Sequence, residues 1–303
     1  MLPKLFVIIV TYKGHQWYER CFASLRNSEY PVQTIVIDNA SNDGTIEYIR
    51  EHFPEIHLIE SKENLGFGRA NNIGMRYALD HGCDYVFLLN QDTWIKPDCL
   101  SIMLPIAEQH PECGIFSPMH IGADEKSLYI EIEDGKTDHA NTLLSDCYFQ
   151  TLKDIYLFHY VNAAAWLLPR ATLETVGGFD PIFFAYGEDD NYLQRVQYFG
   201  KSVGLLPKAQ IIHDHQESKS INNSAYRSIQ TRLVQYTNVL KPLNVQKMLF
   251  FLWRKWILNI LINRKRAQVY HREFSFLRER KREIMYSRKM NQQKGLTWLK
   301  DGE

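Results

Sequence analysis

The stretch DYVFLLNQDTWIKPD, residues 84–98, decides the fold. Residues 85–89 are apolar or aromatic without interruption, which is typical of a strand buried on both faces of a parallel sheet. Asn90, Gln91 and Asp92 follow at once. Many polar residues can make a turn, but two amides and a carboxylate are the groups that a metal ion or a sugar phosphate needs. The sequence therefore predicts a strand whose end faces a ligand.

Similar segments lie on either side of this strand. Apolar strands are expected at 5–12, 32–38 and 56–60, and helices near 17–26 and 45–53. A third helix is expected to open from the Gly/Asn loop 63–74 and to run through residue 79. Strands that alternate with helices of this length indicate an α/β fold with a mostly parallel sheet and right-handed crossovers. Residues 119–160 mix short apolar pieces with many charges and predict an antiparallel insertion. Two short strands are expected at 201–207 and 209–213, and only helices beyond 218.

The charge distribution divides the chain into two parts. Residues 1–218 hold 16 Lys and Arg against 30 Asp and Glu, a net of −14, whereas residues 219–303 hold 19 against 5, a net of +14. We therefore expect an acidic catalytic body at 1–218, with halves at about 1–118 and 119–218, and a basic helical C-terminal extension at 219–303.

The apolar and cysteine content indicates a cytoplasmic protein. The five cysteines are scattered without CxxC spacing, as in reduced thiols. The N-terminus is too short and strand-like for a signal peptide, and no window of about 18 apolar residues predicts a transmembrane helix.

Polar residues follow three of the predicted strands where each strand ends. In open α/β sheets, ligands bind beyond the carboxyl ends of the strands, so a nucleotide would explain all three clusters. Asp38 could accept a hydrogen bond from a base, and Asp92 could hold Mg²⁺ or Mn²⁺ against a diphosphate. Taken singly, each residue could equally cap a loop or turn. The three clusters are Thr11-Tyr12, Asp38-Asn39 and Asn90-Gln91-Asp92.

The loop NLGFGRANNIG, residues 64–74, carries glycines at a predicted helix start. It lacks the Gly-Lys-Ser/Thr ending of a phosphate-binding P-loop and the third glycine of a dinucleotide fingerprint. Its glycines allow a ligand to approach the backbone closely, although a tight strand-to-helix turn would explain them too.

Seven segments share one order with a known protein family. They are VIIVTYKG (7–14), DNASNDGT (38–45), the loop 64–74, LLNQD (88–92), GGFD (177–180), YGEDDNYLQR (186–195) and IIHDHQES (211–218). In this order they resemble the family 2 glycosyltransferases, and the likeness covers about residues 4–218. The chain resembles most the rhamnosyltransferase-like branch of bacterial polysaccharide assembly. This resemblance implies a GT-A fold and inverting transfer from a nucleotide-diphosphate sugar.

The resemblance assigns roles on the donor side. Asp38 resembles the base-binding aspartate, and Asn90-x-Asp92 resembles the metal-binding DxD element. Asn71 stands where the family commonly has an arginine, with Arg69 close by. The donor-binding candidates in this loop are Asn64, Gly66, Arg69 and Asn72.

The acids 188–190 resemble the family's catalytic ED element. The resemblance implies that Asp189 is the general base, next to Glu188. Asp190 stays a second choice, because Asn191 stands where the branch often has another acid. A carboxylate in reach of an acceptor hydroxyl can take its proton during attack. Alternatively, three acids could simply favour a helix N-terminus through its dipole.

Two further residues follow from the resemblance. His213 matches a late histidine that completes the metal site, with His215 as the alternative. Trp166 lies where the family lines its acceptor pocket, although plain core packing would also explain a tryptophan there.

The basic extension contains a helix, 247–266, with Trp and Phe among Lys and Arg. Such a helix can lie in a membrane interface, attracted by anionic lipid, and acceptors of this branch are commonly polyprenyl-linked. We therefore expect a peripheral protein on the inner face of the cell membrane. Packing on the body and a homodimer contact are the alternatives, and no motif supports nucleic-acid binding.

The expected function is transfer of a sugar, with rhamnose a candidate, to a glycan or polyprenyl-linked acceptor in cell-surface polysaccharide synthesis. One rival is a nucleotidyltransferase, which would show a Gly-rich loop with Arg and Lys after the first strand. VTYKGHQWYER (10–20) has no such form. The other rival is a non-catalytic sugar-binding or scaffold subunit.

Overall fold

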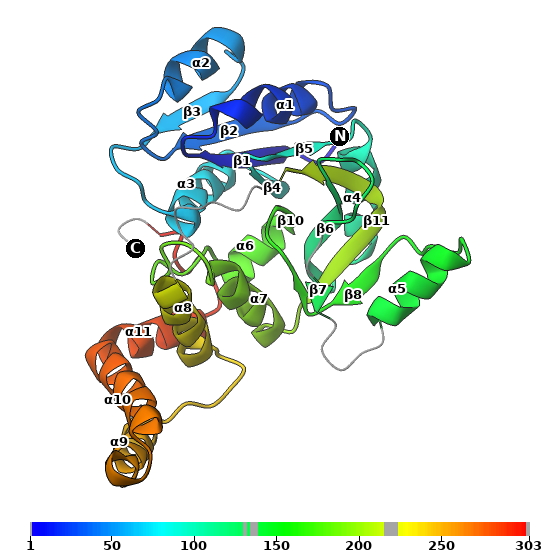
Figure 1. Cartoon of the computed structure of the whole chain (residues 1–303). Coiled ribbons are helices and arrows are strands. Elements are labelled where there is room, and N and C mark those ends of the chain that lie inside the picture. The colour runs from blue at the N-terminus through cyan, green and yellow to red at the C-terminus, as the bar shows by residue number, and fades with distance from the viewer. Residues whose placement is uncertain (1, 130–131, 134–138, 215–223, 301–303) are drawn as a thin grey trace.

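The computed structural model describes residues 2–129, 132–133, 139–214 and 224–300 (Figure 1). Within them, nine strands form one central sheet in the order β3-β2-β1-β4-β10-β6-β11-β5, with β8 paired to β11. The predicted α/β fold is confirmed.

One half of the sheet is parallel, as predicted. β1 lies between β2 and β4, and β2 pairs with β3, all in parallel register. The predicted strand at 85–89 is confirmed and ends at Asn90. The elements of this half are β1 (Leu5–Thr11), α1 (His15–Arg26), β2 (Gln33–Asp38), α2 (Thr45–His52), β3 (His57–Glu60), α3 (Phe67–Asp80) and β4 (Tyr85–Asn90).

The other half is mixed and differs from the prediction in detail. The two short strands expected at 201–207 and 209–213 are one strand, β11 (Ser202–His213), whose register against β6 shifts between Leu206 and Gln210. Pro207 lies within this shift, where the missing N–H of proline costs no ladder bond. The other elements are β5 (Thr93–Ile95), α4 (Cys99–Gln109), β6 (Cys113–Gly122), β8 (Tyr156–Phe158), β10 (Ala165–Pro169), α6 (Arg170–Val176) and α7 (Glu188–Tyr198).

The expected antiparallel insertion at 119–160 is found only in part. β7 (Ile132–Glu133) pairs antiparallel with β9 (Tyr160–Val161), and β8 pairs antiparallel with β11. A helix, α5 (His139–Tyr148), lies between them and was not predicted.

Helices cover both faces of the sheet, so each strand is apolar on both sides. Phe6 and Ile8 pack in the cluster that α3, α6 and α7 complete. Leu5, Val7 and Ile9 pack in the cluster that α1, α2 and α4 complete. Figure 1 shows α1 and α2 on one side of the sheet and α3, α6 and α7 on the other. This two-sided burial explains the continuous apolar runs in the sequence.

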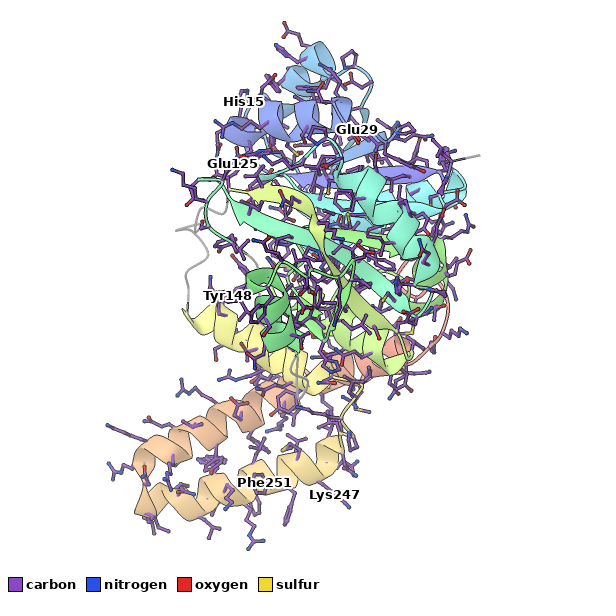
Figure 2. The ribbon with its side chains drawn as sticks, turned by 90° about the vertical axis from the view of Figure 1, so that its right-hand side faces the viewer. His15, Glu29, Glu125, Tyr148, Lys247 and Phe251 are labelled. Carbon is purple, nitrogen blue, oxygen red and sulfur yellow. The ribbon has the colours of Figure 1, made fainter. Side chains whose placement is uncertain are left out.

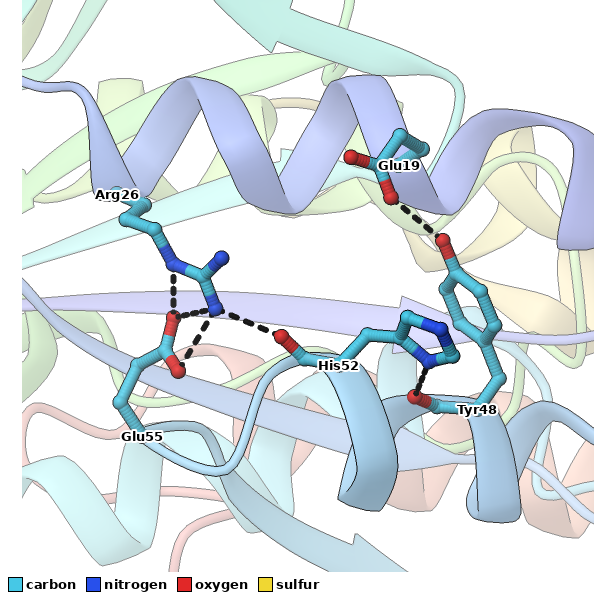
Figure 3. Close-up of polar contacts among 5 residues, drawn as sticks. All are labelled: Glu19, Arg26, Tyr48, His52 and Glu55. Atoms are coloured by element: carbon cyan, nitrogen blue, oxygen red, sulfur yellow. Dashed lines mark hydrogen bonds and ion pairs between the residues drawn. The ribbon is translucent and has the colours of Figure 1, made fainter.

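Helices α1 and α2 are joined at the surface (Figure 3). Arg26 contacts Glu55 at 2.8 Å and donates to the His52 carbonyl at 2.8 Å, and Tyr48 Oη donates to Glu19 at 2.7 Å. Exposed pairs of this kind contribute little stability. The position of α2, which follows the polar loop 38–44, rests mainly on Ile49, which packs in the core against α1.

The described part of the C-terminal extension is helical, as predicted. α9 and α10 form an antiparallel hairpin that projects from the body (Figures 1 and 2). The chain reverses at Asn263, whose side chain caps α10 by accepting from Arg266 N at 3.1 Å. The helices are α8 (Ser224–Thr237), α9 (Val245–Ile262), α10 (Arg264–Glu279) and α11 (Lys281–Asn291). The expected boundary at 218/219 lies outside the described residues.

The end of the extension packs back into the body. Asp180 is 1% exposed, and its carboxylate accepts from Ser287 Oγ at 2.5 Å and Asn291 Nδ2 at 2.7 Å. Trp298 Nε1 donates to Asn291 Oδ1 at 2.9 Å, and Gly178 N donates to the Thr297 carbonyl at 2.8 Å. Helix α11 therefore supplies donors to a buried carboxylate of the body.

We predict that Asn291→Ala destabilises the protein by about 1–3 kcal/mol, because it removes a donor from the buried Asp180 carboxylate. The free energy of unfolding in urea measures this. Lys289→Ala, at an exposed position of the same helix, is the control and should change it by less than about 0.5 kcal/mol. Equal effects of the two changes would contradict the prediction.

Candidate active site

The residues after β4 shape the neighbouring loop. Gln91 Oε1 accepts from Tyr12 N at 2.9 Å, and Gln91 Nε2 donates to the Tyr12 carbonyl at 3.2 Å. Asn90 is half-buried, and its backbone N donates to the Ala164 carbonyl at 2.9 Å. Gln91, predicted to contact the donor, thus uses its amide to hold the loop after β1.

Asp38 and Thr11 lie beneath the surface, and neither has any exposed area. Asp38 accepts from Thr11 Oγ1 at 3.0 Å, from Ser41 N at 3.0 Å and from Ser41 Oγ at 2.5 Å. These bonds occupy both carboxylate oxygens and fix the loop after β2. Because Asp38 has no exposed area, a base could contact it directly only if the surrounding loop moved. Tyr12, which is 40% exposed, presents the accessible ring at this strand end.

The glycine loop before α3 is tied to the loop after β2. Asn39, which the sequence placed in the cluster after β2 without a role of its own, donates through Nδ2 to Asn64 Oδ1 at 3.0 Å and to the Gly66 carbonyl at 3.2 Å. Asn39 Oδ1 accepts from Leu65 N at 2.8 Å. Only its place beside Asp38 at a strand end could have identified Asn39 from the sequence.

Gly66 brings this loop against the segment before the acids. Its φ is +78°, which favours glycine, and a Cβ there would lie 2.0 Å from the Phe184 carbonyl oxygen. The same carbonyl accepts from Phe67 N at 3.1 Å. Gly66 is therefore needed for the close approach of residues 66 and 184.

Two other donor candidates bind backbone. Asn72 donates to the Phe179 carbonyl at 2.8 Å and accepts from Phe179 N at 2.7 Å. Arg69 donates to the Pro181 carbonyl at 3.2 Å. Both side chains fasten α3 to residues 179–181, which lead to the acids.

The three acids form the first turn of α7, as the helix-dipole argument favours. Gly187, at φ +89°, turns the chain into the helix. Asp189 Oδ2 accepts from Tyr160 Oη at 3.4 Å, and Asp189 Oδ1 accepts from Asp190 N at 2.9 Å. Tyr160 is a residue that the sequence did not identify.

Glu188 differs from its neighbours because it is buried, with 7% exposure. Its Oε2 has no hydrogen-bond partner among the residues that the structure describes. Burial, and then the charge of Asp189, raises the pKa of Glu188 to about 8. The raised pKa favours the neutral form of Glu188 and so weakens the negative charge beside Asp189.

Asp92 and His213 meet although 121 positions separate them. Antiparallel pairing of β5 with β11 places Thr93 opposite His213, and Asp214 N donates to the Asp92 carbonyl at 2.9 Å. As a result Asp92 Oδ1 lies 3.5 Å from His213 Nε2, with the side chains 18% and 4% exposed.

This pair suits a divalent cation that a substrate helps to bind. A carboxylate oxygen and an imidazole nitrogen are both ligands that Mn²⁺ accepts, and 3.5 Å lets them share one ion. The described residues include no group of three His, Cys, Asp or Glu that could hold a metal. The remaining ligands would come from diphosphate oxygens. His215, the alternative ligand, lies outside the described residues.

The structure corrects the role of Trp166. The ring has no exposed surface, its Nε1 donates to the Val161 carbonyl at 3.2 Å, and it stacks on Phe179 with centroids 6.4 Å apart. An acceptor could not reach it, so the core-packing interpretation applies.

Sequence relatives point to sugar transfer. The chain is 27% identical over 241 residues to the N-acetylglucosaminyl-diphospho-decaprenol L-rhamnosyltransferase of Mycobacterium tuberculosis, covering 72% of this chain and 78% of that protein. It is 24% identical over 214 residues to the dTDP-rhamnosyl transferase RfbF of Shigella flexneri, covering 70% of each.

Solved structures share the fold. S. aureus TarS (1–349) in complex with UDP-GlcNAc matches with a TM-score of 0.59 at 13% identity, over 95% of this chain and 89% of that chain. The mannosyltransferase PcManGT from Pyrobaculum calidifontis, in complex with GDP-Man and Mn²⁺, matches with a TM-score of 0.52 at 19% identity, over 79% and 64%. The sheet and its helices are thus of the GT-A type.

The family model for glycosyl transferase family 2 matches residues 6–159, more than half of the chain. This range runs from the second residue of β1 to the residue after β8 and includes β2 to β4, their loops and the Asp92 turn. The chain belongs to glycosyl transferase family 2, and it is a glycosyltransferase with rhamnosyltransferases among its relatives.

Proposed function

We propose that the protein transfers L-rhamnose, with inversion, from a nucleoside-diphosphate sugar to a hydroxyl of a lipid-linked glycan in polysaccharide synthesis. The observation that carries this proposal is the carboxylate–imidazole pair of Asp92 and His213, 3.5 Å apart at the end of the sheet where a diphosphate would complete a metal site. The names of two relatives support dTDP-L-rhamnose as the donor and an N-acetylglucosaminyl-diphospho-polyprenol as the acceptor.

The residues of α7 would do the proton transfer. Asp189 takes the proton of the acceptor hydroxyl as that oxygen attacks the anomeric carbon. Tyr160 Oη, 3.4 Å from the Asp189 carboxylate, orients it. Protonated Glu188 keeps a second negative charge away from the attacking oxygen.

Asp92 and His213 would hold Mn²⁺ or Mg²⁺ together with the donor's diphosphate. When bound, the cation offsets the negative charge that develops on the leaving nucleoside diphosphate. Asn39, Asn64 and Gly66 hold the loop that lies between this edge of the sheet and α7.

The hairpin of α9 and α10 would place the protein on the inner face of the cell membrane. Many apolar side chains of α9 are exposed, and the two most exposed lie at the turn, where Leu261 is 95% and Ile262 80% exposed. Arg264, Lys265 and Arg266 follow after Asn263, as an anionic surface would favour. The other exposed apolar residues of α9 are Phe250, Phe251, Trp253, Ile257, Leu258 and Ile260.

None of the helices that the structure describes is long and apolar enough to cross a membrane. The side chains near Lys247 and Phe251 extend away from the body in Figure 2, consistent with interfacial contact. A homodimer contact through the same helices is the alternative proposal.

We predict that Asp92→Asn, which removes the ligand charge, lowers transfer by orders of magnitude and abolishes stimulation by Mn²⁺. Initial rates with dTDP-L-rhamnose, with and without EDTA, measure this. Asp98→Asn, at an exposed turn position six residues on, is the control. Full activity of the wild-type protein in EDTA would remove the metal from the mechanism.

We predict that Asp189→Asn lowers transfer by about 10²–10⁴-fold, because the amide keeps the shape but takes no proton. Calorimetry should find unchanged binding of the donor. Asp190→Asn is the matched variant on the same turn. If it abolishes transfer while Asp189→Asn does not, the base is Asp190, and a wild-type chain that turns over no donor favours the scaffold alternative.

We predict that the double variant Leu261→Glu, Ile262→Glu loses most binding to anionic phospholipid vesicles, since each buried aliphatic side chain contributes about 1.5–3 kcal/mol. Co-sedimentation measures binding, which should also weaken as salt rises. Leu144→Glu, at a 66% exposed position of α5, is the control. A dimer that the double variant converts to a monomer would support the homodimer alternative instead.

A further inference from the structure

Two exposed aromatic side chains lie immediately before the catalytic acids. Phe184 is 50% exposed and Tyr186 is 40% exposed, and Ala185 separates them. Asp189, the proposed base, is three residues beyond Tyr186. Exposed aromatic side chains beside a catalytic site indicate a binding surface when contacts with neighbouring residues hold them in place. Such contacts hold Phe184 and Tyr186.

Contacts from two directions hold this segment. On one side the Phe184 carbonyl accepts from Phe67 N at 3.1 Å, in the glycine loop. On the other side Tyr226 of α8 serves both backbone groups of Ala185. Its Oη accepts from Ala185 N at 3.2 Å and donates to the Ala185 carbonyl at 3.0 Å.

The ring of Tyr186 is itself positioned. The guanidinium of Arg227 lies 5.3 Å from the ring centroid, a cation–π distance. The backbone of Tyr186 has φ +64°, which is rare and costly for a bulky side chain. Such conformations persist only where surrounding contacts impose them, and they concentrate at functional sites.

We infer that Phe184 and Tyr186 form an aromatic platform on which a sugar ring of the acceptor stacks beside Asp189. This inference rests on the proposed function. A base must lie within hydrogen-bond reach of the hydroxyl that it deprotonates, so the acceptor sugar has to lie next to α7. The apolar C–H face of a pyranose fits an aromatic face, and the hydroxyl at its edge then points to the carboxylate.

The platform offers an acceptor accessible aromatic rings, which Trp166 does not. Trp166 is buried in the core, whereas the rings of residues 184 and 186 are accessible. The same segment contacts the glycine loop through Phe184 and helix α8 through Ala185. An acceptor bound here would therefore lie between the proposed donor site and the C-terminal helices.

The test compares Tyr186→Ala, Tyr186→Phe and Phe184→Ala with Tyr198→Ala. Tyr198, at the far end of α7, is 40% exposed like Tyr186 and serves as the matched control. The probes are dTDP-L-rhamnose and an N-acetylglucosaminyl diphosphate with a short alkyl chain. Initial rates at varied acceptor concentration are measured together with donor hydrolysis in the absence of acceptor.

We expect Tyr186→Ala and Phe184→Ala to raise KM for the acceptor about tenfold or more, with donor hydrolysis and KM for the donor unchanged. Tyr186→Phe keeps the ring and should restore wild-type behaviour, and Tyr198→Ala should match the wild type.

An unchanged acceptor KM in Tyr186→Ala would overturn the platform, as would an equal loss of donor hydrolysis, which would assign the loop to the donor site. A wild-type protein that neither hydrolyses the donor nor transfers it would instead contradict the proposed function.

Discussion

The carbonyl of Phe184 occupies the space that a side chain on residue 66 would fill, and the site depends on this contact. Residues 66 and 184 lie far apart in the chain, one leading into α3 and the other into α7. Because Gly66 has no Cβ, the backbone of the loop can lie against the backbone of the acid-bearing segment. Asn72 and Arg69, further along α3, bind the backbone of Phe179 and Pro181 and extend the same junction.

The three acids at the start of α7, next to this junction, differ in burial. Glu188 is buried, and burial raises its pKa, which favours its neutral form. Asp189 is less buried and accepts from Tyr160 and from a backbone N–H. The two neighbouring carboxyls therefore lie in unequal environments, and in the proposed mechanism Asp189 is the one that acts as base.

The C-terminal extension is part of this arrangement. Ser287 and Asn291 donate to the buried Asp180 carboxylate, and Tyr226 holds Ala185, so α11 and α8 both support the segment that precedes the acids. Helices α9 and α10, in contrast, project outward with exposed aliphatic side chains. The C-terminal extension thus contains two helices that pack on the body, α8 and α11, and a projecting hairpin, α9 and α10, whose exposed apolar side chains suit contact with a membrane or another protein.

The sequence by itself determined the α/β class, the strand that ends at Asn90 and the family, because these follow from local patterns of apolar and polar residues. Only the tertiary structure decided which polar side chains bind the chain's own backbone, as Gln91 and Asn72 do, and that Trp166 is buried. It alone brings Asp92 to His213, since the pairing of β5 with β11 joins segments far apart in the chain. Such contacts depend on strand register and loop packing, which local sequence patterns do not encode.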